Sequence, residues 1–270
     1  MKVQTTKSFS TDFGVKILIY GPSGAGKTYA ASTLQGFKPV IISAESGTLS
    51  LRKFDIPMID IAKDDSGKPV EMKDRIARLL EVFKFLKLGQ HPFDTIYLDS
   101  LTEVSQCLMA YLKNKYPDKK DSLPMYGENA EVMMKIIREF RDLKYNVIVT
   151  ALSSIDKDDV GRRFSSPDVV GKVSQNLPQL FDEVFYLHHK QDESGNMVRK
   201  FQTVPTEGIA SPKDRSGILE SFEEIKLGEI INRVRATIEV PKPVVAPVPA
   251  AYIPMKKVDL INMKRVPVTK

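Results

Sequence analysis

Short runs of consecutive apolar residues alternate with helical periodicity along most of the first 150 positions. The apolar runs cover residues 15–20, 39–43, 57–61, 95–99 and 146–151. Segments with the spacing of amphipathic helices lie at 27–35, 70–88, 101–115 and 128–143. Strands that alternate with helices are typical of a parallel sheet covered on both faces. The pattern therefore predicts an α/β fold with a mainly parallel central sheet.

The pattern changes after residue 180. Residues 182–189 and 197–204 have the composition of strands, and a turn-like segment joins them. This arrangement predicts a β-hairpin at one edge of the sheet. Residues 221–237 follow with helical spacing and predict a closing helix.

From residue 240 the sequence PKPVVAPVPAAYIP forms a Pro/Val/Ala linker that cannot build a core. We therefore divide the chain into an N-terminal segment (1–13), an α/β core (14–238) and a flexible linker with a basic tail (239–270). The net charge of +6 belongs mostly to this tail, where six Lys or Arg face one Asp. Bulk basicity consequently says little about the core, and a nucleic-acid surface there would have to be a local cluster.

Composition excludes several classes of protein. A single cysteine, Cys107, rules out a disulfide framework, and three scattered histidines leave no zinc-ligand spacing. No apolar segment approaches the roughly 20 residues that span a bilayer. We expect a cytoplasmic protein without a membrane partner.

The strongest motif is GPSGAGKT, which matches the phosphate-binding pattern GxxxxGK[ST] between a predicted strand and a predicted helix. Its positions are Gly21, Pro22, Ser23, Gly24, Ala25, Gly26, Lys27 and Thr28. The glycines allow backbone N–H groups to turn toward phosphates, Lys27 reaches the β and γ phosphates, and the Thr28 hydroxyl ligates Mg²⁺. The motif predicts that the chain binds ATP and Mg²⁺.

Two acidic residues lie at or just after the carboxyl ends of other predicted strands. Asp99 closes the apolar strand 95–99, which is the position of the aspartate that holds Mg²⁺ through water. We prefer this role to capping of the next helix, for which Ser100 is suited. Glu45 follows the strand 39–43 and is the candidate general base, although from position alone an exposed loop glutamate is an equal alternative.

The sequence resembles the RecA/Rad51 recombinase core, which places its catalytic glutamate in an AE dipeptide and ends its aspartate strand in DS. Here these pairs are Ala44-Glu45 and Asp99-Ser100. The chain is more similar still to the short phage-encoded ATPases of this type, the Sak-type single-strand annealing proteins labelled phage nucleotide-binding proteins. The similarity covers roughly residues 14–237. It rests on KILIYGPSGAGKT, FDTIYLDSLTEV, VIVTAL and the segments 125–127, 169–172, 181–184 and 213–217.

This resemblance implies an ATPase, with DNA-dependent hydrolysis, that acts on single-stranded DNA in phage recombination or replication in the host cytoplasm. It also implies a homo-oligomeric ring or filament and a single-stranded-DNA-binding protein as partner. Thr150 and Ser153 are candidates for sensing the γ-phosphate, and simple backbone satisfaction is an equal alternative.

In rings of this type a neighbouring subunit supplies a cation to the γ-phosphate. Lys213 and Arg215, in the loop SPKDRSG, are the candidates for this role, with a self-paired surface turn as the even alternative. Arg199 and Lys200 on the predicted hairpin are the second choice.

The same resemblance places DNA contacts in the loops after the third and fourth core strands. The candidates in the first loop are Lys113, Lys115, Tyr116, Lys119 and Lys120, and those in the second are Arg162, Arg163, Phe164 and Lys172. Cations interleaved with aromatic rings suit phosphate contact and base stacking. Aspartates dilute both loops, so a solvated mixed-charge surface is the alternative.

Two other functions stay open. A P-loop small-molecule kinase would need an arginine lid, for which Arg162 and Arg163 are available. A nonhydrolysing, nucleotide-gated binding module would recruit partners through the tail.

Overall fold

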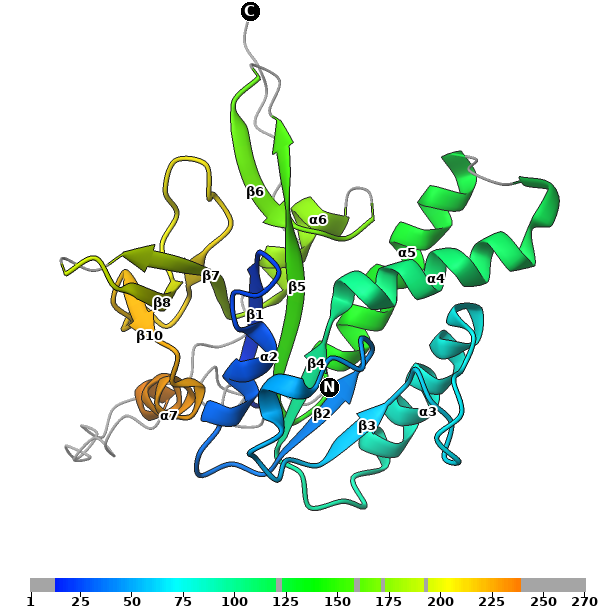
Figure 1. The fold of residues 1–270 in the computed structure, drawn as a ribbon, viewed down its shortest axis with the longest axis horizontal. Coiled ribbons are helices and arrows are strands. Elements are labelled where there is room, and N and C mark those ends of the chain that lie inside the picture. Colours follow the sequence, from blue (N-terminus) through cyan, green and yellow to red (C-terminus); the bar gives the residue numbers. More distant parts are fainter. Residues whose placement is uncertain (1–12, 120–122, 158–160, 171–172, 192–193, 239–270) are drawn as a thin grey trace, which may run out of the picture. The chain divides into compact units, whose positions relative to one another are not determined.

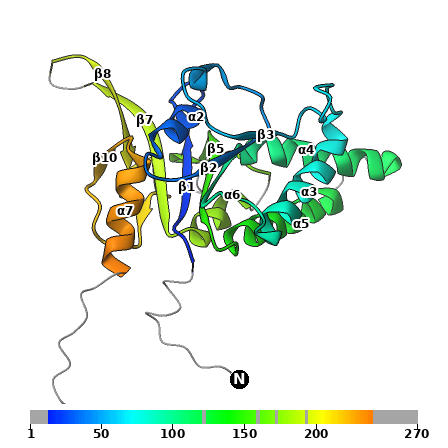
Figure 2. The same ribbon diagram turned by 90° about the horizontal axis from the view of Figure 1, so that it is seen from below.

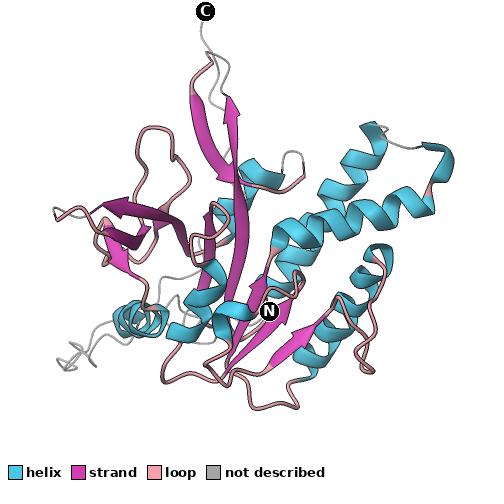
Figure 3. Cartoon of the chain, viewed as in Figure 1, coloured by secondary structure: helices cyan, strands magenta, loops and turns pink. Residues whose placement is uncertain are grey.

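The computed structural model of the protein describes residues 13–119, 123–157, 161–170, 173–191 and 194–238 (Figures 1 and 3). The predicted linker and tail, and all but the last residue of the predicted N-terminal segment, lie outside the described residues. Two of the DNA-binding candidates, Lys120 and Lys172, also lie outside them.

A central sheet carries the fold, and its strands run in the order β10-β8-β7-β1-β5-β4-β2-β3. The strands from β7 to β3 are parallel to one another. They are β7 (Glu183–Gln191), β1 (Lys16–Gly21), β5 (Asn146–Lys157), β4 (Thr95–Asp99), β2 (Pro39–Ser43) and β3 (Met58–Asp60). All five apolar runs of the sequence are strands of this sheet. The predicted α/β class with a mainly parallel sheet is confirmed.

Antiparallel strands complete one edge. The predicted hairpin is confirmed as β7 and β8 (Met197–Gln202). On this edge β10 (Phe222–Glu224) pairs with β8, and the short β9 (Lys213–Asp214) pairs with the start of β7. The prediction of one helix over 221–237 was therefore wrong at its beginning, because pairing with the edge of β8 holds residues 222–224 extended; helix α7 begins only at Leu227 and ends at Ile238.

A second hairpin projects from the sheet. Strand β5 runs past its predicted end to Lys157 and pairs with β6 (Arg163–Pro167), from Ser153 opposite Pro167 to Lys157 opposite Arg163. Figure 1 shows this hairpin extending beyond the other strands. The prediction of a loop after residue 153 was wrong here, because the two segments satisfy each other's backbone groups away from the main sheet.

Helices cover both faces of the sheet. Helices α3 (Arg75–Leu88), α4 (Leu101–Lys115) and α5 (Leu123–Arg141) pack in one core cluster with Leu18 and Tyr20 of β1. Helices α2 (Lys27–Ala30) and α7 pack in the other cluster with Ile17 and Ile19. Successive residues of a strand point to opposite faces, so β1 is buried on both sides. Figure 2 shows α3, α4 and α5 grouped together and α7 beside β7 and β10.

The helix boundaries differ from those predicted. A 3₁₀ turn, Met72–Asp74, precedes α3, and α2 passes into another, Ala31–Thr33, instead of continuing to residue 35. Helix α5 begins five residues earlier than expected and ends at Arg141. The short α6 (Val173–Asn176) lies near the amino end of β7 in the sequence. The carboxyl ends of β1, β2 and β4 lie at one edge of the sheet, because these strands are parallel to one another.

Candidate active site

The turn between β1 and α2 has a backbone that requires glycine at two positions. Gly26 has φ 110°, and a Cβ atom there would lie 3.3 Å from Nη1 of Arg199. A Cβ on Gly21 would lie 2.3 Å from the carbonyl oxygen of Leu187 in β7. Gly26 is thus favoured by its backbone angle and Gly21 by the close approach of β7, in agreement with the glycines of the motif.

Lys27 begins α2 and points back into the turn. Its Nζ donates to the carbonyl oxygens of Gly21 (2.8 Å) and Pro22 (2.9 Å). An ammonium has three N–H donors, so these bonds use two of them. Burial lowers the pKa of Lys27, while Asp99 and Glu45 act in the opposite direction. The cation is thus held where the turn surrounds it.

Thr28 and Asp99 meet on the same side of the turn. The Thr28 hydroxyl donates to Oδ2 of Asp99 at 2.6 Å, and the Thr150 hydroxyl donates to Oδ1 of the same carboxylate. The hydroxyl of Tyr97 donates to the Lys27 carbonyl, which ties the strand of Asp99 to the start of α2. A carboxylate and a hydroxyl at this spacing form the hard oxygen donor set that Mg²⁺ binds, with phosphates and water as its other ligands. The residues therefore fit the magnesium site that the sequence predicts.

Glu45 lies beside Asp99 because β2 and β4 are neighbours. Ser43 pairs with Asp99 in register, so the residues that follow each strand leave the sheet at the same edge. The Ser100 hydroxyl donates to Oε1 of Glu45 and accepts from the backbone N–H of Glu103. Ser100 is thus the N-cap of α4, as expected. The exposed Glu45 side chain is oriented by this hydroxyl.

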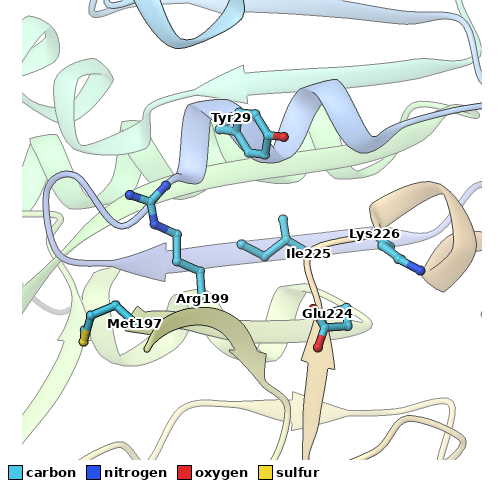
Figure 4. A pocket seen from close by; sticks show the side chains of 6 residues that line it. All are labelled: Tyr29, Met197, Arg199, Glu224, Ile225 and Lys226. Carbon is cyan, nitrogen blue, oxygen red and sulfur yellow. The ribbon is translucent and has the colours of Figure 1, made fainter. Parts of the chain in front are cut away.

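These groups surround a cavity of about 360 Å³, called the phosphate cavity below. Its lining includes Lys27, Thr28, Glu45, Asp99, Tyr29 and Arg199. Arg199 comes from β8 of the same chain, and Figure 4 shows its guanidinium extending toward the start of α2. The sequence suggested Arg199 only as a second choice for contact across a subunit interface.

A model of the AAA domain family matches residues 14–216. The protein belongs to this family. No curated protein matches the chain. Among solved structures it is similar to a prototypical ATPase from the type III secretion system of pathogenic bacteria, at 11% identity and a TM-score of 0.44. The match covers 67% of this chain and 54% of that one, so the chain spans about half the length of that structure.

Thr150 and Ser153, the two candidates for sensing the γ-phosphate, have different surroundings in the AAA domain. Thr150 is buried against Asp99, whereas Ser153 lies one residue past Leu152, which lines the cavity. Ser153 pairs with Pro167 at the base of the second hairpin. Of the two candidates, only Thr150 is hydrogen-bonded to the Asp99 carboxylate among the contacts of the described residues.

Lys213 and Arg215 are the candidates for a cation that a neighbouring subunit supplies. They lie near the amino end of β1, whereas the phosphate turn (residues 21–28) follows its carboxyl end. Lys213 donates to the carbonyl oxygens of Pro178 (2.8 Å) and Phe181 (2.7 Å), and Arg215 forms an ion pair with Asp182 at 2.9 Å. Within one copy of the AAA domain they are apart from Lys27. Contact across an interface stays a prediction.

The first group of DNA-binding candidates lies where α4 ends. Lys113 and Lys115 belong to the last turn of α4, and Tyr116 is its C-cap. Lys115 Nζ lies 3.0 Å from a carboxylate oxygen of Glu128 and 4.7 Å from the centre of the Tyr116 ring. Lys119 ends the short 3₁₀ turn that follows. One acidic side chain therefore offsets part of this local positive charge.

The second group lies on the projecting hairpin. Arg163 and Phe164 open β6 opposite Lys157 and Asp156, and Arg162 directly precedes the strand. Arg162 and Arg163 are exposed and Phe164 is partly buried. The hairpin thus presents two arginines beyond the edge of the sheet that carries the phosphate turn.

Among the described residues of the AAA domain, none of the helices is long and apolar enough to cross a membrane.

Proposed function

We propose that this AAA domain protein hydrolyses ATP with Mg²⁺ and uses the reaction to act on single-stranded DNA in phage recombination or replication, with a RecA-like core. One observation carries the hydrolysis: Lys27, Thr28, Asp99 and Glu45 line one cavity at the carboxyl edge of the sheet. Open α/β sheets bind ligands at this edge.

Each residue then has a defined task. Lys27 and the backbone N–H groups of the turn hold the β and γ phosphates. Thr28 and Asp99 hold Mg²⁺, which when bound neutralises charge on the phosphates. Glu45, oriented by Ser100, accepts a proton from the attacking water. Thr150, which donates to the Asp99 carboxylate, keeps that carboxylate aimed at the metal position.

The DNA-directed part of the proposal rests on the recombinase resemblance and on two local features. The end of α4 presents the Lys115 ammonium over the Tyr116 ring, and the hairpin β5–β6 carries the exposed Arg162 and Arg163. Cations beside rings suit phosphate contact together with base stacking. Assembly into a ring or filament would bring Lys213 and Arg215 to a neighbouring site, and a single-stranded-DNA-binding protein is the expected partner.

The experiment that tests this proposal is an ATPase assay of the full chain with and without single-stranded DNA. We expect DNA to increase turnover, nucleosides and small metabolites to leave it unchanged, and Lys27→Ala to abolish it. Turnover that responds to a small metabolite, with phosphate transferred to it, would instead establish a kinase. The position of Arg162 and Arg163 on the hairpin, outside the lining of the phosphate cavity, favours the ATPase.

A further inference from the structure

A second cavity, of about 570 Å³, adjoins the phosphate cavity (Figure 4). It is lined by Tyr29, Met197, Arg199, Glu224, Ile225 and Lys226. Tyr29 and Arg199 line both cavities. The space beside the phosphate turn therefore continues between α2 and the strands β8 and β10.

The direction of a bound triphosphate follows from the residues at the two ends of the phosphate cavity. Glu45 and Asp99 mark the end where the γ-phosphate reacts, and Thr28 leads from there along α2 to Tyr29. A third cavity, on the far side of Glu45, is lined by the ion pair of Arg75 with Glu103. That cavity adjoins the reacting end, so the rest of the nucleotide has to leave past Tyr29.

We propose that the second cavity binds the nucleoside of the triphosphate, with its base between Tyr29 and Ile225 and with Arg199 over the phosphates nearest the nucleoside. This inference rests on the proposed binding of ATP and names the residues that recognise the rest of the molecule. In Figure 4 the Ile225 side chain lies below Tyr29, and the Arg199 guanidinium is directed toward the start of α2.

The surfaces offered to the base are apolar and held in place. Tyr29 is 41% exposed, and its ring lies edge-to-face with Phe54 at 6.1 Å between centroids. Ile225 is partly buried and packs against the core cluster that includes α2 and α7. An exposed ring beside a phosphate site provides a stacking surface, which every nucleobase can use.

The rim of the cavity is polar. Glu224 forms an ion pair with Lys200 at 3.2 Å, and Lys226 forms one with Glu229 at 3.4 Å. The Lys226 backbone N–H also donates to the Glu224 carbonyl at 2.8 Å, which fixes the two positions relative to each other. A carboxylate and an ammonium at the rim provide an acceptor and donors for ribose hydroxyls and the edge of a base.

Fluorescence provides a direct test, because the chain contains no tryptophan. Tyr29→Trp would place a single reporter in the proposed cavity. We expect ATP and ADP to change its emission strongly and inorganic tripolyphosphate, which has no nucleoside, to change it little. Equal changes with ATP and tripolyphosphate would overturn the inference.

Binding measurements separate this inference from the function on which it rests. We expect Tyr29→Ala to weaken ATP binding about tenfold, a typical loss for one stacking contact, and to leave tripolyphosphate binding within about twofold. Tyr111→Ala is the matched control, because Tyr111 is 42% exposed on α4 and lines none of the three cavities described above. Equal losses for both ligands would overturn the nucleoside site, whereas failure of the unmodified protein to bind either ligand would overturn the proposed function itself.

Discussion

The hydroxyl of Thr28 lies 2.6 Å from Oδ2 of Asp99, although 71 positions separate the two residues in the chain. Strand β1 leads to Thr28 and β4 ends at Asp99, with β5 between the two strands. The contact therefore spans the width of a strand and depends on the order of the sheet. It brings a hydroxyl oxygen and a carboxylate oxygen together at the carboxyl edge of the sheet.

This contact predicts that Asp99→Asn weakens binding of ATP in the presence of Mg²⁺ and has little effect in its absence. The amide has no negative charge to attract the cation, so we expect a loss of at least about tenfold. Calorimetric titration of ATP with Mg²⁺ or with a chelator measures the two affinities. The exposed Asp65 on a surface turn provides the control Asp65→Asn. A similar loss with and without Mg²⁺ would show that Asp99 supports the fold rather than the metal.

Glu45 provides the test that distinguishes hydrolysis from simple nucleotide gating. Glu45→Gln keeps the shape of the side chain and its contact with Ser100 but cannot take up a proton. We expect ATP to bind as before and turnover to fall at least tenfold, which corresponds to about 1.4 kcal/mol in the barrier. Steady-state phosphate release measures this, with Glu81→Gln on the exposed face of α3 as the control. Unchanged turnover would mean that Glu45 is not the base.

That the turn 21–28, Asp99 and Glu45 lie at one edge of the sheet could be predicted from the motif and from the strands that precede the two acids. GPSGAGKT specifies its own backbone, and the two acids follow apolar strands whose carboxyl ends meet in a parallel sheet. Ser100 could be predicted as a cap because its hydroxyl bonds the backbone three residues later. The strands β7 and β8 could also be predicted, from their strand-like composition and the turn-like segment between them.

The position of Arg199 could not be predicted in the same way. Its approach to Gly26 requires β8 to pair with β7 beside the phosphate turn, and this depends on contacts between residues more than 150 positions apart. The sequence offered one signal for the position of Arg199. Side chains alternate between the two faces of a strand, so a strand at 197–204 places Met197 and Arg199 on the same face. Likewise, residues 222–224 are extended only because the edge of β8 is free to pair with them. Such tertiary pairing overrides local helical preference.

Arg199 is predicted to act within its own chain. We expect Arg199→Ala to weaken ATP binding about tenfold, since a charge-assisted hydrogen bond to a phosphate is lost. Arg235→Ala on α7 is the control, because Arg235 is exposed and lines neither the phosphate cavity nor the second cavity. A fluorescent ATP analogue measures both affinities.

Mixing two variant chains, at an ATP concentration at which each variant alone has low activity, then separates contact within one subunit from contact across an interface. Arg199→Ala mixed with Lys27→Ala should gain no ATPase activity. Lys213→Ala or Arg215→Ala mixed with Lys27→Ala should gain activity, because the Lys27→Ala chain supplies the missing cation to its neighbour. The reverse pattern would exchange the roles of Arg199 and the Lys213–Arg215 loop.

The hairpin β5–β6 is predicted to contact DNA phosphates through Arg163. We expect Arg163→Ala to weaken binding of single-stranded DNA and to reduce the slope of log K against log salt by about 0.7, the value for one lost phosphate contact. Fluorescence anisotropy over a range of salt concentrations measures the slope. Arg235→Ala on α7, where the arginine is also exposed, is the control. An unchanged slope with Arg163→Ala would exclude a contact between Arg163 and a DNA phosphate.

Glu183 predicts how stability changes with pH. Burial, together with the neighbouring Asp214, raises the pKa of its carboxyl from 4.5 to about 7. The folded protein therefore holds a proton that the unfolded chain has lost between these two values, so the contribution of Glu183 to stability falls as pH rises from about 4.5 to 7. Glu183→Gln keeps a hydrogen-bonding group without this penalty. We expect it to raise stability at pH 8 by about 2 kcal/mol, or Tm by about 5 °C, and to have little effect at pH 5.

Thermal unfolding of the unmodified protein and the variant at both pH values measures this difference, in which the titration of all other groups cancels. Glu81→Gln, at an exposed position, should leave Tm unchanged at both pH values. Because the Glu183 carboxyl accepts from the Ser216 backbone N–H at 3.2 Å, the glutamine oxygen can replace that bond while its amide donates toward Asp214. A variant that is less stable at both pH values would show that the carboxyl is charged and stabilising in the folded protein, opposite to the raised pKa.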